Sequence, residues 1–206
     1  MNGVIWLFIV SGLAIVAWAV AGTQSFITMT TLHPLVMGFV KVFFLGTCGE
    51  ILKKKGQVDK IWQRAFVWGL WGIWFVYAFP LFSQAVEFFV SQNLWPTGPK
   101  LWLAFSKSLW LCVLGGYAWS MMVAHEYFNH LIKTNWRVWH FEPFADQANP
   151  RLLISFLWKS ILFFWLPAHT CTYLAPSQWR VLIAALLSVA LGFILTMTAG
   201  KKAPSR

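Results

Sequence analysis

Acidic residues are scarce in this chain. Asp and Glu together number six, against sixteen Lys and Arg, and charged residues make up only 11% of the 206 residues. A soluble domain of this size is usually about a quarter charged. Few carboxylates are therefore available to form a catalytic pair of acidic residues. In addition, no Gly-x-Ser-x-Gly nucleophile motif occurs. We therefore predict no catalytic residues and do not expect an enzyme.

Cysteine is also rare. The chain has three, Cys48, Cys112 and Cys171, and no two of them have the spacing of a metal site. Since all three fall within or beside apolar stretches, we expect free thiols that pack as small apolar residues. The sequence predicts neither a metal centre nor a cofactor.

Apolar residues dominate instead. They make up 59% of the chain, whose mean hydropathy is +0.63, and about 20 apolar residues in a helix cross the hydrocarbon core of a bilayer. The composition predicts an all-α, polytopic transmembrane helix bundle that forms one domain over residues 1–206. A short polar loop is expected after the first span, and Pro80 is expected to kink or end the third. The six predicted spans are residues 3–21, 34–52, 66–90, 101–123, 152–169 and 181–198.

Positive charge is distributed unequally between the loops. Eleven Lys and Arg lie on one predicted side of the membrane and two on the other, so the positive-inside rule places the richer side and both termini in the cytoplasm. The richer side holds Lys53, Lys54, Lys55, Lys60, Arg64, Lys133, Arg137, Arg151, Lys201, Lys202 and Arg206, and the other holds Lys100 and Arg180. Because the start is not Arg-rich and Ser-rich like a transit peptide, we favour a bacterial inner membrane.

The net charge of +10 is explained by this basic rim. Lys and Arg beside a membrane surface attract anionic lipid, so lipid is the expected partner and nucleic acid is not. A homo-oligomer or a larger membrane complex is the other partner that the sequence allows.

Three lysines interrupt predicted spans: Lys41, Lys107 and Lys159. A lysine at the centre of a span costs about 2.5–3.5 kcal/mol on insertion scales, so we predict that these three side chains line a polar interior, to which Glu50 is also assigned. Cations without matching intramembrane acids would make that interior attract anions. The alternative is that each stem lifts its ammonium toward an interface, and the sequence leaves both interpretations open.

Two histidines, His33 and His169, are predicted near the outer face on different helices. Such a pair could ligate a haem or a chlorophyll-type pigment. His33 directly precedes a proline and His169 follows one by two residues, both at span boundaries where a histidine needs no ligand, and we therefore predict no bound cofactor.

Small residues in the spans predict close helix contacts. Gly38, Gly46 and Gly49 lie in the second span, and Gly115 and Gly116 lie in the fourth. Small side chains let helix backbones approach one another in lipid. Together with the many tryptophans, these faces suggest docking to other membrane proteins as an alternative function.

The stretch TYLAPSQWR, residues 172–180, carries a family resemblance. It resembles the signature of the Mpv-seventeen and peroxisomal membrane protein (Mpv/PMP) family, in which an aromatic residue, a proline and an arginine four residues later enter the last helix. Tyr173, Pro176 and Arg180 take those places. The run from His33 to Leu52 resembles an early helix of the family, with Glu50 at its acidic position. The first span looks like an additional helix.

The resemblance implies a small integral membrane protein that forms a channel or influences the balance of metabolites across a membrane. Our leading expectation is therefore a channel-like protein that handles small solutes, with a preference for anions. The alternative is a non-catalytic accessory subunit of a larger membrane complex that docks through its Trp-rich and Gly-rich faces.

Overall fold

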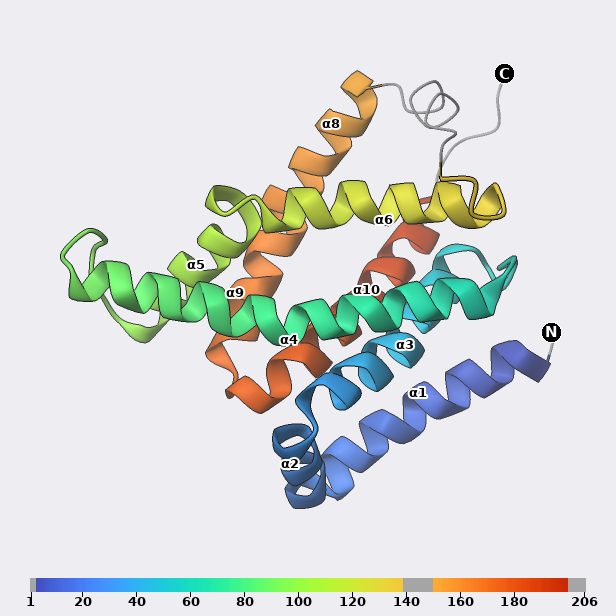
Figure 1. The fold of residues 1–206 in the computed structure, drawn as a ribbon, viewed down its shortest axis with the longest axis horizontal. Coiled ribbons are helices and arrows are strands. Elements are labelled where there is room, and N and C mark those ends of the chain that lie inside the picture. The colour runs from blue at the N-terminus through green and yellow to red at the C-terminus, as the bar shows by residue number, and fades with distance from the viewer. Residues whose placement is uncertain (1–2, 139–149, 200–206) are drawn as a thin grey trace. The chain divides into compact units, whose positions relative to one another are not determined.

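Helices make up all the regular secondary structure that the computed structural model describes, which covers residues 3–138 and 150–199, apart from the side chains of residues 150–153, 156, 195 and 197–199 (Figure 1). Within these ranges, four helices are long and apolar enough to cross a membrane, and a bent pair would make a fifth. The prediction of an all-α protein is confirmed, and several helices have the length and composition of membrane spans. The four are α1 (Gly3–Ala21), α3 (Pro34–Lys53), α4 (Ile61–Ser91) and α10 (Ser177–Ala199). In α10, the part long and apolar enough to cross a membrane is Ser177–Ile194.

The chain forms two units, and α4 contributes to both. The first unit comprises Met1–Tyr77 and Gln178–Arg206, and the second comprises Ala78–Ser177. The predicted spans 3–21, 34–52 and 66–90 closely match α1, α3 and α4. Pro80 does not end α4, which continues as helix to Ser91. The six-span count remains a prediction.

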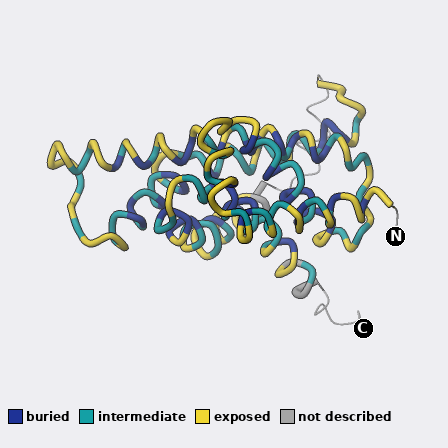
Figure 2. Tube along the Cα trace, turned by 90° about the horizontal axis from the view of Figure 1, so that it is seen from below, coloured by how far each residue is buried: buried dark blue, intermediate teal, exposed yellow. Residues whose placement is uncertain are grey.

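The first unit begins with α1, which packs against α3 (Figure 1). The buried residues of α1 are Ile5, Phe8, Gly12 and Ala19, which share one helix face because of their spacing. Buried and exposed positions likewise alternate along the other helices (Figure 2). Each helix therefore has a packed side and an open side, as expected for helices surrounded by lipid.

A short helix, α2 (Thr23–Leu32), occupies the place where a polar loop was predicted. Its polar side chains are compatible with helix because hydroxyls can bond to carbonyls of their own helix. Thr28 donates to the Gln24 carbonyl at 2.9 Å, and Thr31 donates to the Ile27 carbonyl at 2.9 Å. The helix ends before Pro34, whose ring disfavours helical conformation in the preceding residue.

Glycines bring α3 into backbone contact with two other helices of the first unit. A Cβ atom at Gly38 would lie 2.8 Å from the carbonyl oxygen of Gly72 on α4, and one at Gly49 would lie 2.5 Å from the carbonyl oxygen of Ser188 on α10. Gly46 lies against the ring of Trp68. The prediction that these three α3 glycines mark helix contacts is confirmed.

The second unit contains the remainder of α4 and a set of shorter helices, in which α5 packs closely against α9. The hydroxyl of Ser108 on α5 donates to the carbonyl of Leu166 on α9 at 2.7 Å. The helices of this unit are α5 (Lys100–Leu109), the π-helical turn η1 (Trp110–Leu114), α6 (Tyr117–Lys133), α8 (Pro150–Ser160), the π-helical turn η2 (Ile161–Trp165) and α9 (Leu166–Leu174).

The predicted span 101–123 is not one straight helix. Helix runs from Lys100 to Leu114, breaks, and resumes at Tyr117 with a bend of 48°. Gly116 has a φ of +68°, a left-handed conformation that glycine adopts without penalty and that commonly ends helices. A Cβ at Gly116 would meet nothing within 4 Å, so this glycine makes a turn and not the close contact that was predicted.

The predicted span 152–169 lies within a helical segment, Pro150 to Leu174, that is divided by η2. The turn η2 is a π-helical turn, which is wider than an α-helical one, and Pro167 lies two residues after it. Proline has no N–H to donate to the preceding turn, and its ring crowds the carbonyl four residues earlier. The N–H of Leu166 bonds instead to the Ile161 carbonyl, the five-residue spacing of a π-turn.

We predict that Gly72→Ala destabilises the protein, because the added Cβ would overlap the Gly38 carbonyl oxygen. Overpacking of this kind typically lowers the free energy of unfolding by about 1–3 kcal/mol. Thermal unfolding in detergent measures the effect. Gly3→Ala is the matched control, since its Cβ meets nothing within 4 Å, and equal melting temperatures for the two variants would contradict the proposed backbone contact.

Candidate functional site

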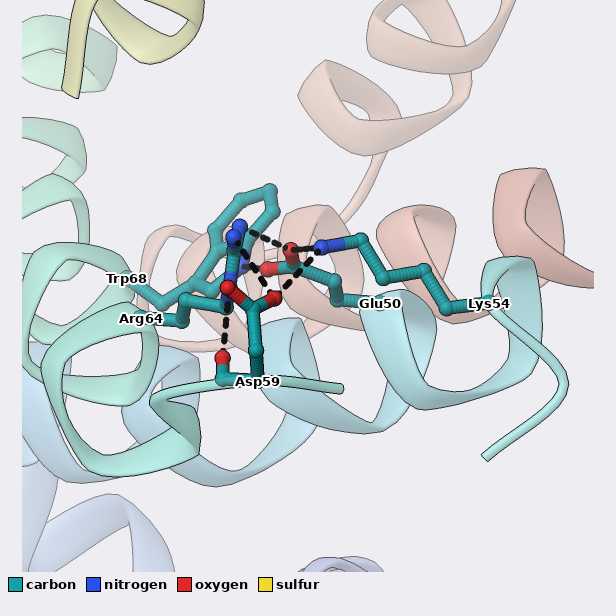
Figure 3. Close-up of polar contacts among 5 residues, drawn as sticks. All are labelled: Glu50, Lys54, Asp59, Arg64 and Trp68. Carbon is teal, nitrogen blue, oxygen red and sulfur yellow. Dashed lines mark hydrogen bonds and ion pairs between the residues drawn. The ribbon is translucent and has the colours of Figure 1, made fainter. Parts of the chain in front are cut away.

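A cluster of charged residues joins the end of α3 to the start of α4 (Figure 3). Glu50 lies one turn before the end of α3, and its Oε1 accepts from Arg64 at 2.7 Å and pairs with Lys54 at 3.1 Å. Its Oε2 accepts from the indole of Trp68 at 3.1 Å. The carboxylate is thus bound on both oxygens.

Arg64 holds the connection between the two helices. Its side chain is 1% exposed. Besides Glu50, it donates to the backbone carbonyl of Asp59 at 2.9 Å and to the Asp59 carboxylate at 3.1 Å. A buried guanidinium is tolerated only when charge and hydrogen bonds compensate for its lost hydration. Because each charge here is matched, we interpret the cluster as a structural lock on the loop between α3 and α4.

Asp59 forms the exposed rim of this cluster. Partial burial acts to raise the pKa of its carboxyl, but the positive charges of Arg64 and Lys54 outweigh that effect and hold the pKa below its usual value of 3.8. A carboxyl with a lowered pKa in the folded state stabilises the protein above the unfolded value, and this contribution is lost as the pH falls through the folded value. The lock therefore keeps its Asp59 contacts throughout the neutral range.

Lys41, in the middle of α3, lies in a different environment. Its side chain is fully buried, and its ammonium donates to the hydroxyl of Thr30 on α2 at 2.8 Å. The same ammonium lies 4.5 Å from the ring centroid of Phe26, also on α2. No acidic residue pairs with Lys41 among the residues that the structure describes. We refer to Lys41, Thr30 and Phe26 as the Lys41 site.

Lys107, in contrast, has an acidic partner. Its ammonium lies 2.6 Å from a carboxylate oxygen of Glu87 on α4, and the same oxygen accepts from Ser83 at 3.2 Å. The expectation that the lysines in the spans lack matching acids is wrong at this position. Charge compensation makes Lys107 less attractive to a further anion than Lys41.

Lys159 is exposed on α8 and has no hydrogen bond or ion pair within the described ranges. An exposed ammonium fits either interpretation made from the sequence, a side chain that lines a polar path or one that reaches toward an interface. Lys107 and Lys159 share the second unit but make no bond to each other in its described part, and Lys41 belongs to the first unit.

The two histidines also differ. His33 is exposed at the junction of α2 and α3 in the first unit. His169 is buried in the second unit, stacked on Trp165 at 5.5 Å and edge-on to Phe79 at 5.6 Å. Over the described residues, no group of three His, Cys, Asp or Glu side chains is placed to hold a metal ion.

The signature-like residues lie at the junction of α9 and α10. The Tyr173 hydroxyl donates to the Phe79 carbonyl at 3.3 Å within the second unit. Pro176 falls in the break between the helices, and α10 begins at the next residue. Arg180 lies in the first turn of α10, half-buried. The expectation that this stretch leads into the last helix is confirmed.

Several partners in these clusters could not be identified from the sequence. The pairing of Glu50 with Lys54 follows from their four-residue helical spacing, but Arg64 counts only as a loop charge until the start of α4 is known. Thr30 and Phe26 were assigned to a loop. Glu87 could not be identified as the partner of Lys107, because sequence spacing alone does not show which face of α4 meets α5.

We predict that Arg64→Met lowers the free energy of unfolding by about 3–5 kcal/mol, the usual cost of removing one partner of a buried ion pair. Lys54→Met is the control, since Lys54 is partly exposed and such pairs contribute at most about 1 kcal/mol. Chemical denaturation in detergent measures both. If the lock is as described, Glu50→Gln should recover part of the loss when added to Arg64→Met. Equal stability of Arg64→Met and Lys54→Met would contradict it.

Comparison with protein-family models, with curated proteins and with solved structures finds no match to this chain. The resemblance to the Mpv/PMP family therefore rests on the motifs quoted from the sequence. The feature of the molecule that bears most on function is the contrast between the neutralised Glu50 cluster and the ammonium of Lys41, which has no acidic partner among the described residues.

Proposed function

We propose that this protein is an integral membrane protein with a channel-like role in the movement of small solutes, and that it favours anions. The observation that carries the proposal is the Lys41 site. A fully buried ammonium has only a hydroxyl and an aromatic ring as partners there. The resemblance to the Mpv/PMP family supports the same class of function.

The physical argument concerns the cost of an uncompensated charge. Moving an ammonium from water into a protein interior costs several kcal/mol, and the loss is recovered only through strong partners. A hydroxyl bond and a cation–π contact recover part of it. An anion that enters the site would supply the missing charge, so the Lys41 site is a favourable binding position for one.

We further propose six spans with both termini in the cytoplasm of a bacterial inner membrane. In this topology the fourth span is formed by α5 with η1 and continues into α6 after the bend, and the fifth is formed by α8, η2 and α9. The eleven-to-two distribution of Lys and Arg supports this orientation. The C-terminal Lys201, Lys202 and Arg206 lie outside the described residues.

An accessory subunit of a larger membrane complex is the second candidate. Large exposed aromatic side chains favour it, among them Trp6, Trp62 and Trp74 of the first unit. The glycines of α3 do not support it, because their contacts are already made within the chain. Co-purification with a large complex after gentle detergent extraction would favour this alternative over the channel-like function.

We predict that reporter fusions after Lys60, after Asp146 and at the C-terminus report the cytoplasm. Fusions at Thr97 and Ser177 should report the opposite side, because positive loops are retained on the cytoplasmic side. Alkaline phosphatase and green fluorescent protein activities provide complementary readouts. A C-terminus found outside the cytoplasm would contradict the six-span topology.

We predict that Lys41→Met abolishes anion flux in liposomes that contain the pure protein. Methionine keeps much of the stem of the side chain and removes its charge. A fluorescent anion indicator in the liposome interior measures the flux. Lys53→Met is the matched control, since Lys53 is exposed on the same helix, and its flux should equal that of the unchanged protein. A folded Lys41→Met protein with undiminished flux would refute the role of Lys41.

A further inference from the structure

The hydroxyl of Thr30 adds a second donor to the Lys41 site. Thr30 Oγ accepts from the ammonium of Lys41, which leaves its own hydrogen to donate. Its neighbours on α2 behave differently, because Thr28 and Thr31 donate to carbonyls of their own helix. Thr30 makes no such bond within the part of the chain that the structure describes. An ammonium and a hydroxyl therefore stand side by side, both able to donate.

The aromatic ring that contacts the ammonium, that of Phe26, is itself packed against other rings. Phe26 is fully buried, and its ring contacts Trp18 edge-on at 5.4 Å and Trp179 at 5.3 Å. The indole N–H of Trp18 is already used, since it donates to Ser25 at 2.8 Å. Phe26 therefore supplies apolar surface beside the ammonium and no hydrogen-bond donor.

Two properties of an occupant follow. The single positive charge can neutralise one negative charge, and the cost of removing an ion from water rises with the square of its charge. With few donors to replace its water shell, the site would favour an ion that holds water weakly. A divalent oxyanion would keep an unpaired charge and lose many hydrogen bonds on entry.

We propose that Lys41 and Thr30 together bind one monovalent, weakly hydrated anion, such as nitrate, iodide or thiocyanate, in preference to sulfate or phosphate. This inference rests on the proposed anion-handling function and specifies its substrate class. Lys41 supplies the charge, the Thr30 hydroxyl supplies a directed hydrogen bond, and the Phe26 ring lies against the ammonium.

The test combines flux and binding on the full-length protein. Flux into liposomes is measured for sodium nitrate, iodide, sulfate and phosphate. Binding of each salt to the protein in detergent is measured at equal ionic strength by the shift in melting temperature. The variants are Lys41→Met, Thr30→Val and the matched control Thr28→Val, in which the lost hydroxyl donated only to its own helix.

We expect the protein to conduct nitrate and iodide. We expect these two salts to raise its melting temperature relative to that of Lys41→Met in the same salt, whereas sulfate, which stabilises proteins in general by exclusion from their surface, should shift both proteins equally. Thr30→Val should lower nitrate flux by about three- to tenfold, the range that one hydrogen bond accounts for, while Thr28→Val leaves it unchanged. Both threonine variants keep a β-branched side chain of the same shape, and their elution as the same detergent-solubilised species verifies folding.

Each other outcome has a distinct meaning. Sulfate or phosphate flux equal to that of nitrate, and dependent on Lys41, would overturn this inference and leave the proposed function intact. Stabilisation by nitrate that depends on Lys41 and Thr30, without flux of any ion, would support the binding site and overturn the channel-like function. Neither flux nor stabilisation would overturn both. Equal effects of Thr30→Val and Thr28→Val would remove Thr30 from the site.

Discussion

The close approach of α3 to its neighbours is the constraint on which the first unit depends. Glycines replace side chains at the points where α3 meets α4 and α10, so the backbones themselves are in contact. In lipid, helix association relies on such close packing because apolar surface gains little by leaving hydrocarbon. The consequence is that half of α3 is buried, and each polar side chain on its packed face needs a partner from the protein.

Glu50 and Lys41 show two solutions to that requirement on the same helix. Glu50 is surrounded by cations and an indole, and its charge is neutralised within a network that also fixes the following loop. Lys41 has one hydrogen bond to a hydroxyl and one contact with an aromatic ring, and neither partner cancels its charge. This difference between a neutralised carboxylate and an ammonium without an acidic partner is the basis of the functional proposal.

The sequence was sufficient to predict the long helices and insufficient to predict the breaks. Runs of about 20 apolar residues have one stable form in lipid, so the bounds of α1 and α3 followed from counting. The bend at Gly116 and the π-turn before Pro167 depend on local backbone geometry, which hydropathy does not report. The inward-facing position of Lys41 was one of two interpretations that followed from the cost of burying its charge, and the structure shows the side chain buried. Its partners Thr30 and Phe26 were not predicted, because α2 was taken for a loop and a loop has no defined faces.

Arg64 would act at two successive stages of membrane insertion. In the proposed topology it is one of the positive residues that retain the loop between α3 and α4 on the cytoplasmic side while the chain inserts. That rule counts Lys and Arg with little regard to nearby acids, so it acts before Arg64 meets Glu50. Once α3 and α4 associate, the same guanidinium is withdrawn from the surface and bonded internally. A single residue thereby serves first as an orientation signal and then as a fastening that makes the inserted arrangement costly to reverse.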